Sequence, residues 1–468
     1  MSTDSDTDTD NQSRDAADLL ADRRRYFDTG ATRPAAWRRG QLRALRRLLA
    51  DRSDELTAAL EEDLGKSRTE AFLSEIAVVR AELDYALKHL DRWMAPEKIG
   101  VPAGLLPARA WTQARPLGVV LIIGPWNYPL QLVLAPLVGA LAAGNTAVLK
   151  PSELAVATSR TLARLVPEYL DPEAVSVVEG GVEASTALLG QPFDHVFYTG
   201  GERVGKIVMK AAAEHLTPVT LELGGKSPAV VMGGDLRAAA RRIALGKFMN
   251  AAQTCVAPDY ILTTPAAAPV LAAALADAVR DFYGSDPRTS GDYGRIINEH
   301  HFDRLVGLLG DGTVVSGGRH ERAERYIEPT ILRAVDPSSA LMQEEIFGPL
   351  LPILEVEDLD AAIRFIGARP HPLAAYLFSD RAEHLAAFTE RVQAGGIAHN
   401  VCTIQLAVPG LPFGGVGASG TGSYHGRQSF RTFSHLQPVF SKPTGPDTLR
   451  LAYPPFGPIK RKLLSKLL

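Results

Sequence analysis

The chain has 468 residues, of which 46% are hydrophobic and 22% charged, and its formal net charge is -3. This composition is typical of a soluble globular protein and gives no electrostatic footprint for DNA or RNA, so we expect no nucleic-acid partner. One core stops growing at roughly 250 to 300 residues, so two large lobes are expected. The only two cysteines, Cys255 and Cys402, cannot form a disulfide framework, which indicates a reducing compartment and predicts a cytoplasmic protein.

The chain opens on a polar, acidic segment, MSTDSDTDTDNQSRD. It lacks the basic and then apolar start of a secretory signal, so we expect residues 1–15 to be a disordered tail. Between residues 35 and 93, apolar residues recur at three-to-four spacing, which predicts amphipathic helices. A link rich in proline and glycine, VPAGLLPARAWTQARPLG, follows.

The stretch from Pro116 to Leu149 carries no charge over 34 positions. By length alone it could span a membrane. Pro125, Asn127 and two further prolines interrupt it, however, so we predict a buried strand, a tight turn and a buried helix instead.

From this point strands and helices alternate. The pattern predicts strands at 118–123, 146–149, 175–178, 195–198 and 219–221, with helices between them, two of which start at Ser152 and Glu202. Such alternation predicts an α/β fold with a parallel sheet that binds ligands beyond the carboxyl ends of its strands. A second α/β series begins at SPAVVM and runs to about residue 410.

The dinucleotide fingerprint G-x-G-x-x-G occurs once, at Gly415, Gly417 and Gly420. No predicted strand leads into it and no acidic residue follows at the required distance, so we interpret it as a flexible turn. A dinucleotide would have to be held elsewhere.

Two strand ends offer alternatives. After the fourth predicted strand, Gly200 and Gly201 free the backbone to approach a phosphate at a helix N-terminus. After the second, Lys150 and Glu153 could reach a ribose or phosphate, with Ser152 as the helix cap; a solvated helix start explains the same residues.

Cys255 lies between small and polar residues in AAQTCVAPDY. A cytosolic cysteine in such a loop is a candidate nucleophile, although many lone cysteines are only small buried hydrophobic residues. A thiol that attacks a carbonyl needs an oxyanion donor and a base, which Asn127 and Glu222 could supply. The alternative for Asn127 is that its side chain only closes its own turn. Glu222 lies at the end of an apolar strand, where a carboxylate is costly unless it is paired or has a function.

Seven motifs in order resemble the aldehyde dehydrogenase superfamily, and together they span nearly the whole chain: PWNYP (125–129), KPSE (150–153), YTGG (198–201), LELGGKSP (221–228), QTCVAPDY (253–260), EEIFGP (344–349) and LPFGGVGASG (411–420). Three further segments are most similar to the class-three branch of that superfamily: FMNAAQTCVAPDY, SYHGRQSFRTFSH and YPPFGPIKRKLL.

This resemblance implies a domain plan. A Rossmann-like NAD(P)-binding domain would comprise residues 16–97 and 117–223, and an α/β catalytic domain residues 224–432. Residues 98–116 and 433–443 would form a bridging element that makes a homodimer. The tail, 444–468, ends in KRKLLSKLL, for which we expect a terminal helix or frayed end; contact with a membrane surface is the alternative.

The resemblance also implies a reaction, the oxidation of an aldehyde to a carboxylic acid. Cys255 would attack the aldehyde, while the Asn127 side chain and the Cys255 amide hold the oxyanion of the thiohemiacetal. Hydride would pass to nicotinamide, and Glu222 would activate the water that hydrolyses the thioester. Medium- or long-chain aliphatic or aromatic aldehydes are the expected substrates. A CoA-acylating enzyme and a non-catalytic relative are the rival hypotheses.

For the cofactor, the resemblance assigns Lys150 and Glu153 to the adenosine ribose and Glu345 with Phe347 to the nicotinamide ribose. The full set of implied cofactor residues is Trp126, Lys150, Ser152, Glu153, Gly200, Gly201, Val204, Leu223, Gly224, Glu345 and Phe347. The charge of Glu153 disfavours a 2′-phosphate, so NAD is expected, with NADP as the alternative. No metal site is expected.

Three features depart from the family pattern or limit the comparison. Ala252 stands where most members have glycine, and alanine adopts a positive φ only at a cost, so the conformation of the cysteine loop is open. The segment VPGLPFGG replaces a more polar lead-in, so substrate preference cannot be transferred. For His425 we expect a structural rather than a catalytic role.

Overall fold

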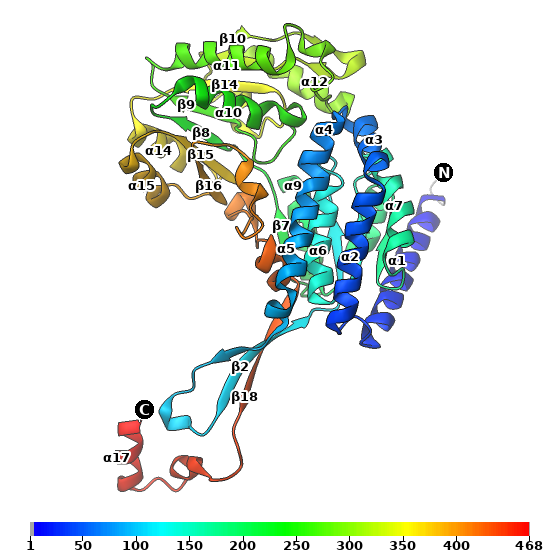
Figure 1. Cartoon of the computed structure of the whole chain (residues 1–468), viewed down its shortest axis with the longest axis vertical. Helices are drawn as coiled ribbons and strands as arrows, with labels where there is room; N and C mark the ends of the chain where they lie inside the picture. The colour runs from blue at the N-terminus through cyan, green and yellow to red at the C-terminus, as the bar shows by residue number, and fades with distance from the viewer. Residues whose placement is uncertain (1–3, 468) are drawn as a thin grey trace.

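The computed structural model describes residues 4–467, which form two α/β lobes and a long projecting arm (Figure 1). Each lobe is built around its own sheet, as the two predicted α/β series require. Among the described residues, no helix is both long and apolar enough to cross a membrane.

The first lobe contains a six-stranded sheet in the order β17-β7-β6-β3-β4-β5. Its strands are β3 (Val119–Ile123), β4 (Thr146–Lys150), β5 (Val175–Val177), β6 (His195–Thr199), β7 (Val219–Glu222) and β17 (Gly420–Thr421). The chain moves outward from β3 to β5 and then returns to β6 on the other side of β3, with all five of these strands parallel. The order therefore reverses between β3 and β6, which is where such sheets form a ligand crevice.

Alternate residues of the central strand face opposite layers of helices. Val120 and Ile122 point into a core that is shared with five helices: α2 (Ala35–Asp51), α3 (Ser53–Leu64), α5 (Ala77–Met94), α6 (Gln131–Ala143) and α7 (Val156–Tyr169). Val119 and Leu121 point the other way, toward α1 (Asp4–Asp28), α8 (Val182–Leu189) and α9 (Glu202–Ala213). Because both faces are covered, the strands are apolar throughout, which is why the sequence predicted them well.

The N-terminal segment differs from the prediction. Helix α1 begins at Asp4, so the expectation of a disordered tail over 1–15 is wrong from that residue on, and residues 1–3 lie outside the described part. Further along, Ala16 and Leu20 are buried against the sheet and anchor the helix.

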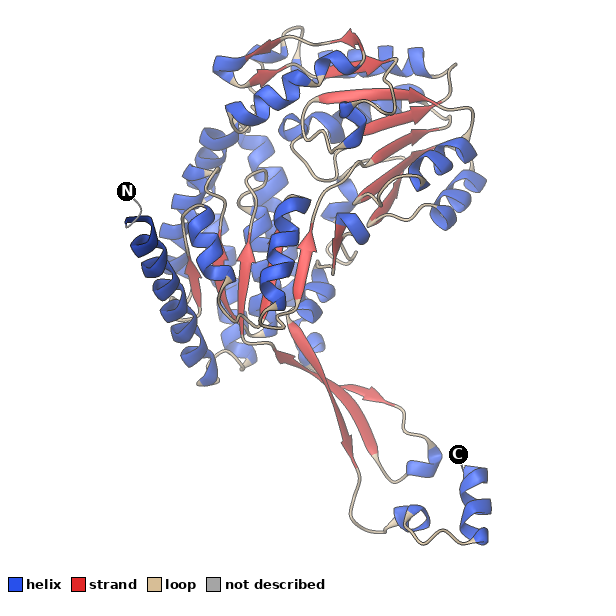
Figure 2. Ribbon diagram, turned by 180° about the vertical axis from the view of Figure 1, so that it is seen from behind, coloured by secondary structure: helices blue, strands red, loops and turns tan. Residues whose placement is uncertain are grey.

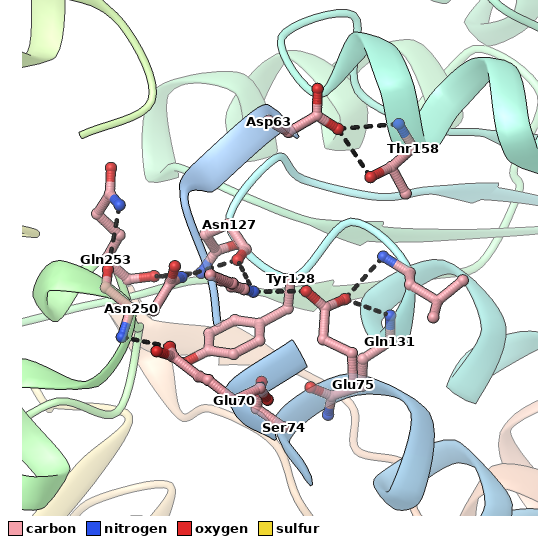
Figure 3. Close-up of polar contacts among 12 residues, drawn as sticks. Asp63, Glu70, Ser74, Glu75, Asn127, Tyr128, Gln131, Thr158, Asn250 and Gln253 are labelled. Atoms are coloured by element: carbon pink, nitrogen blue, oxygen red, sulfur yellow. Dashed lines mark hydrogen bonds and ion pairs between the residues drawn. The ribbon is translucent and has the colours of Figure 1, made fainter. Parts of the chain in front are cut away.

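The helix after β4 also differs from its prediction. It begins at Val156, four residues beyond the predicted start at Ser152, whose hydroxyl accepts a hydrogen bond from the Leu154 amide within a turn. The carboxylate of Asp63, on α3, accepts hydrogen bonds from the amides at the start of α7, including that of Thr158 (Figure 3). A residue far away in the sequence therefore supplies the cap.

The second lobe holds a seven-stranded sheet in the order β10-β13-β14-β9-β8-β15-β16. Its strands are β8 (Pro228–Val231), β9 (Tyr260–Thr263), β10 (Thr313–Ser316), β13 (Thr330–Arg333), β14 (Leu350–Glu355), β15 (Ala374–Phe378) and β16 (Gly396–His399), and all pair in parallel except β10. The main helices are α10 (Leu236–Phe248), α11 (Ala268–Tyr283), α12 (Glu299–Gly307), α14 (Leu359–Gly367) and α15 (Ala382–Arg391).

The arm is a three-stranded antiparallel sheet that points away from both lobes (Figure 2). It consists of β1 (Glu97–Ile99), β2 (Arg109–Pro116) and β18 (Ser434–Ser441), with β2 in the middle. Beyond β18 the chain ends in the short helix α17 (Pro458–Leu467). β2 and β18 lie within the segments that the sequence assigned to the bridging element, whereas β1 begins one residue before them, at Glu97.

A close helix crossing makes the first lobe sensitive to one methyl group. Helix α6 packs against α16 (Gly426–Thr432), and a Cβ atom added at Gly139 would lie 2.6 Å from the Cβ of Ser429. At Gly40, in α2, an added Cβ would meet no atom within 4 Å. The absence of a side chain at Gly139 therefore allows α6 and α16 to cross closely, whereas no close contact depends on glycine at position 40.

We predict that Gly139→Ala lowers the free energy of unfolding by about 1 to 3 kcal/mol through overpacking. Gly40→Ala should raise it by roughly 0.5 to 1 kcal/mol because alanine is the better helix former. Denaturant midpoints of the two variants and the parent check this. Equal stabilisation by both alanines would contradict the crossing.

Candidate active site

The turn after β3 lies at the point where the strand order reverses, and it carries Asn127. This side chain is 3% exposed, and its Nδ2 donates a hydrogen bond of 2.9 Å to the carbonyl of Gln253. Gln253 belongs to the loop that leads to Cys255 in the second lobe. The structure therefore brings the predicted oxyanion donor against the cysteine loop.

The cysteine loop has an unusual backbone. Asn250, Ala251 and Ala252 have φ values of 53°, 49° and 64°. The conformation that glycine would favour is thus adopted by alanine at 252, at a cost of roughly 1 to 2 kcal/mol per residue. The Gln253 side chain holds the loop, because it donates to the carbonyls of Asn250 and Arg295 and accepts from the amide of Ile297.

Cys255 shares its site with two acidic residues. Its side chain is partly exposed, and burial, together with the carboxylates of Glu345 and Glu222, raises the pKa of the thiol. Burial raises the pKa of Tyr424, and the charges of Glu222 and Cys255 raise it further. Cys255, Glu222 and Glu345 are thus close enough for their charges to interact.

Glu222 ends β7 and is 2% exposed. Among the described residues, neither of its carboxylate oxygens has a hydrogen-bond partner. Burial raises its pKa well above the ordinary value of a glutamate. A buried carboxyl without a partner is costly, which makes Glu222 a candidate functional group.

Glu345 and Phe347 lie on the other side of the site. A Cβ atom at Gly224 would lie 2.1 Å from an oxygen of Glu345, so glycine is required for this approach. Burial and nearby Asp259 raise the pKa of Glu345 to about 8. Phe347 meets the ring of Trp126 edge-on at 5.3 Å, which places two predicted cofactor residues from different lobes together.

The remaining predicted cofactor residues lie at the ends of β4, β6 and β7. Lys150 is 1% exposed, and its ammonium group lies 3.9 Å from the carboxylate of Glu153. Burial lowers the pKa of Lys150. Ser152 closes the turn described above, and Leu223 lies directly after β7, where its side chain packs close to Gly205.

The start of α9 fits a phosphate and an adenine. Gly201 precedes the helix, and a Cβ atom there would meet nothing within 4 Å. By contrast, a Cβ at Gly200 would collide with the Tyr198 hydroxyl at 2.2 Å. Val204 follows in the first turn and is 37% exposed. An open helix N-terminus beside a buried lysine and an exposed apolar side chain suits a dinucleotide.

The G-x-G-x-x-G segment lies beside Glu222 as a tight turn, in agreement with the prediction of a turn rather than a phosphate loop. Cβ atoms at Gly415 and Gly420 would lie 2.0 and 2.2 Å from backbone carbonyl oxygens. β17, which starts at Gly420, pairs with β7 directly opposite Glu222. The segment therefore closes the edge of the sheet and does not hold a phosphate.

His425 lies close by, at the start of α16, with a φ of 77°. Its ring stacks on Phe413, its backbone amide donates to Ser429, and burial lowers its pKa to about 4. These contacts favour the structural role that the sequence suggested.

A half-open pocket with about 500 Å³ of empty space lies between α5 and the segment from Leu406 to Pro409. Its lining is mostly apolar and comprises Leu73, Ala77, Val78, Ala81, Glu82, Ala135, Leu406, Ala407, Pro409 and His425. Gln405 donates to the Tyr376 hydroxyl, which in turn donates to the carbonyl of Val256, the residue after Cys255. The pocket wall is thus connected to the cysteine loop.

Sequence reasoning missed a buried polar cluster behind Asn127, which Figure 3 shows in part. It contains Lys66, Glu70, Glu75, Asn250 and Gln253. The signal that could have found it is the one that singled out Glu222: Glu75 is a lone charge within the apolar run AFLSEIAVV.

Comparisons with known proteins agree with this geometry. The model of the aldehyde dehydrogenase family matches residues 7–439. Aldehyde dehydrogenase family 3 member B2 of Mus musculus is 48% identical over 444 residues, which cover 94% of this chain and 93% of that protein. The dimeric NADP-preferring aldehyde dehydrogenase of Canis lupus familiaris is 46% identical over 434 residues, covering 92% and 96% of the two chains.

Among solved structures, the substrate-bound state of Staphylococcus aureus AldH superimposes with a TM-score of 0.93 at 44% identity, covering 96% of this chain and 98% of the other. The predicted fold class and the predicted family are both confirmed. The chain belongs to the aldehyde dehydrogenase family, whose members oxidise aldehydes with NAD or NADP as the hydride acceptor.

Proposed function

We propose that Cys255, Asn127 and Glu222 carry out the oxidation of an aldehyde to a carboxylic acid. The observation that supports this most strongly is Glu222, a buried carboxyl that has no hydrogen-bond partner in the described part of the chain and whose charge interacts with the Cys255 thiol. A base that must activate water beside a nucleophile has to keep its oxygens free for that water.

The roles follow from the chemistry of each group. The Cys255 thiol releases its proton to solvent as its sulfur adds to the aldehyde carbon, and the Asn127 amide and the Cys255 backbone amide donate to the oxyanion of the thiohemiacetal. Bound NAD(P) supplies a hydride acceptor. Glu222 then takes a proton from the water that attacks the thioester carbon, which releases the acid and restores the thiol. Burial raises the pKa of Glu222, which strengthens this carboxylate as a proton acceptor once it is ionised.

For the cofactor we propose NAD, held by Lys150 and Glu153 at one end and by Glu345 and Phe347 at the other. The Glu153 carboxylate would repel a 2′-phosphate, although Lys150 lies 3.9 Å from it and could offset part of that repulsion. The canine relative is described as NADP-preferring, so activity assays should use both cofactors.

The catalytic roles predict distinct defects. Cys255→Ala should abolish reduction of NAD by an aldehyde, because no covalent intermediate forms. Glu222→Gln should give one equivalent of reduced cofactor in a burst and then stall, because the thioester is not hydrolysed. Stopped-flow absorbance at the reduced-cofactor band, with acid quantified separately, measures both.

Acid production that persists in Cys255→Ala would contradict the mechanism. Turnover of Glu222→Gln without a burst would remove the base role. Release of an acyl-CoA instead of acid by the parent enzyme would favour the CoA-acylating alternative.

We propose further that the apolar pocket beside α5 takes the tail of a medium- or long-chain or aromatic aldehyde. Its lining offers small apolar side chains, Ala77, Ala81 and Ala135. The segment that forms its wall is linked to the cysteine loop through the hydrogen bonds of the Tyr376 hydroxyl. Each CH₂ group buried there would contribute about 0.8 kcal/mol to binding.

Ala81→Leu should therefore lower kcat/KM for decanal by roughly tenfold, the equivalent of about two lost CH₂ contacts, while kcat/KM for propanal stays within about twofold. Lys88→Leu is the matched control, since it adds a leucine to the same helix outside the pocket. An equal loss for both aldehydes would show that the tail lies elsewhere.

We also propose a homodimer that forms through the arm. Among the described residues, β18 pairs with β2 on one side only, and its Leu436 and Phe440 are 43% and 54% exposed. An edge strand with exposed apolar side chains is suited to pair with another chain.

Sedimentation of the full chain should give twice the monomer mass, and Phe440→Lys should shift the population toward monomer. A parent chain that stays monomeric at micromolar concentration would contradict the dimer.

A further inference from the structure

Lys66 and Glu75 form an ion pair in the interior of the first lobe. Both side chains are fully buried, and the Lys66 Nζ lies 2.5 Å from Oε1 of Glu75. Lys66 follows the end of α3, whereas Glu75 lies in the π-helical turn Phe72–Ile76 between α4 (Arg68–Ala71) and α5. Neither residue has been assigned a role in the site so far.

The two charged groups hold opposite ends of the turn that carries Asn127. Lys66 Nζ donates a second hydrogen bond, of 2.9 Å, to the backbone carbonyl of Asn127. The other oxygen of Glu75 accepts from the amides of Leu130 and Gln131, at 2.9 and 3.0 Å, where α6 begins (Figure 3). The ion pair thus clamps the segment from Asn127 to Gln131.

The same cluster extends to the cysteine loop. The Asn250 side-chain amide donates to the Asn127 carbonyl at 2.8 Å and to the Gln253 carbonyl at 3.2 Å, and Glu70 accepts from the Asn250 backbone amide at 2.7 Å. The Asn127 carbonyl therefore receives two donors, one from each lobe.

A second connection runs through an aromatic ring. The ammonium group of Lys66 lies 4.0 Å from the centre of the Tyr128 ring, and the Tyr128 hydroxyl is 2.7 Å from the hydroxyl of Thr254, next to Cys255. This connection therefore runs from Lys66, which bonds to Asn127, to Thr254, which precedes Cys255 in the chain. Moreover, π-helical turns such as the one that carries Glu75 occur frequently at functional sites.

We propose that Lys66 and Glu75 are positioning residues for the oxyanion donor. By fixing the backbone of Asn127 from behind, they hold its side-chain amide in the orientation that faces the carbon bound to Cys255. This inference rests on the proposed role of Asn127. It explains why a buried ion pair is kept where a hydrophobic pair could fill the space, because a hydrophobic pair could neither donate to the Asn127 carbonyl nor accept from the amides at the start of α6.

The decisive experiment combines Lys66→Met with Asn127→Ala. Lys66→Met should lower kcat by about 10- to 100-fold, since misplacing a reacting group by about 1 Å costs up to ~10²-fold, with the KM for NAD within about twofold. In the Asn127→Ala background, Lys66→Met should lower kcat no further, because its effect passes through the missing amide. Single-turnover formation of reduced cofactor measures all four proteins of the cycle.

Removing one partner of a buried ion pair leaves an uncompensated charge that can unfold the protein. The double variant Lys66→Met/Glu75→Gln removes both charges and so tests the same role without that destabilisation. It should show the same deficit in kcat with a native circular dichroism spectrum. Asp63→Asn is the matched control, because Asp63 caps α7 by two amide hydrogen bonds of 2.9 Å as Glu75 caps α6. It should lower the melting temperature but keep kcat within about twofold.

Additive losses in the Asn127→Ala background would overturn the inference, as would an equal loss of kcat in Asp63→Asn. If Asn127→Ala itself leaves kcat unchanged, the proposed oxyanion role fails, and this single variant separates that failure from a failure of the ion pair.

Discussion

The hydrogen bond between the Asn127 side chain and the Gln253 carbonyl is the contact on which the site depends, because it joins the turn after β3 to the cysteine loop of the other lobe. Each partner is held from behind: the turn by Lys66 and Glu75, and the loop by the Gln253 side chain, which bonds to Arg295 and Ile297. Because both sides are held by other parts of the protein, the Asn127 amide is fixed in place, which suits the proposed oxyanion role, since a preorganised donor need not be ordered during the reaction.

Burial also determines the electrostatics of the site. Burial raises the pKa values of the Cys255 thiol, Glu222 and Glu345, so the resting site avoids placing three negative charges together in a region of low dielectric. Glu222 differs from Glu345 in its surroundings. Glu345 is stabilised by the Gly225 amide and by two lysines, whereas Glu222 has no partner among the described residues. The two carboxyls of the site therefore differ: Glu345 has partners that stabilise its charge, which suits a role in binding, whereas Glu222 has oxygens available for a water molecule, which suits the proposed role as a base.

The sequence predicted the parts whose signal is local. Strands buried on both faces appear as apolar runs, so β3 and β6 were found nearly to the residue, and Glu222 stood out as a charge at an apolar strand end. The start of α7 could not be found, because Asp63 supplies its cap from another helix. Neither could the pairing of Lys66 with Glu75, since spacing does not reveal which buried charges meet. The left-handed alanines of the cysteine loop depend on Gln253, whose partners lie more than forty residues further along.

Burial raises the pKa of Glu222, and the segments that surround this residue lie far apart in the sequence. Glu222 ends a strand that would otherwise be the open edge of the first sheet, and the short strand β17, about two hundred residues later, pairs with it antiparallel. Gly415 and Gly420 allow this segment to lie directly against backbone carbonyls, where any side chain would collide. The Ser419 carbonyl then accepts the amide of Leu223 and fixes the chain just beyond the carboxyl group. A glycine pattern that resembles a phosphate loop therefore serves a different purpose: it seals the edge of the sheet beside Glu222, a side chain whose pKa is raised by burial.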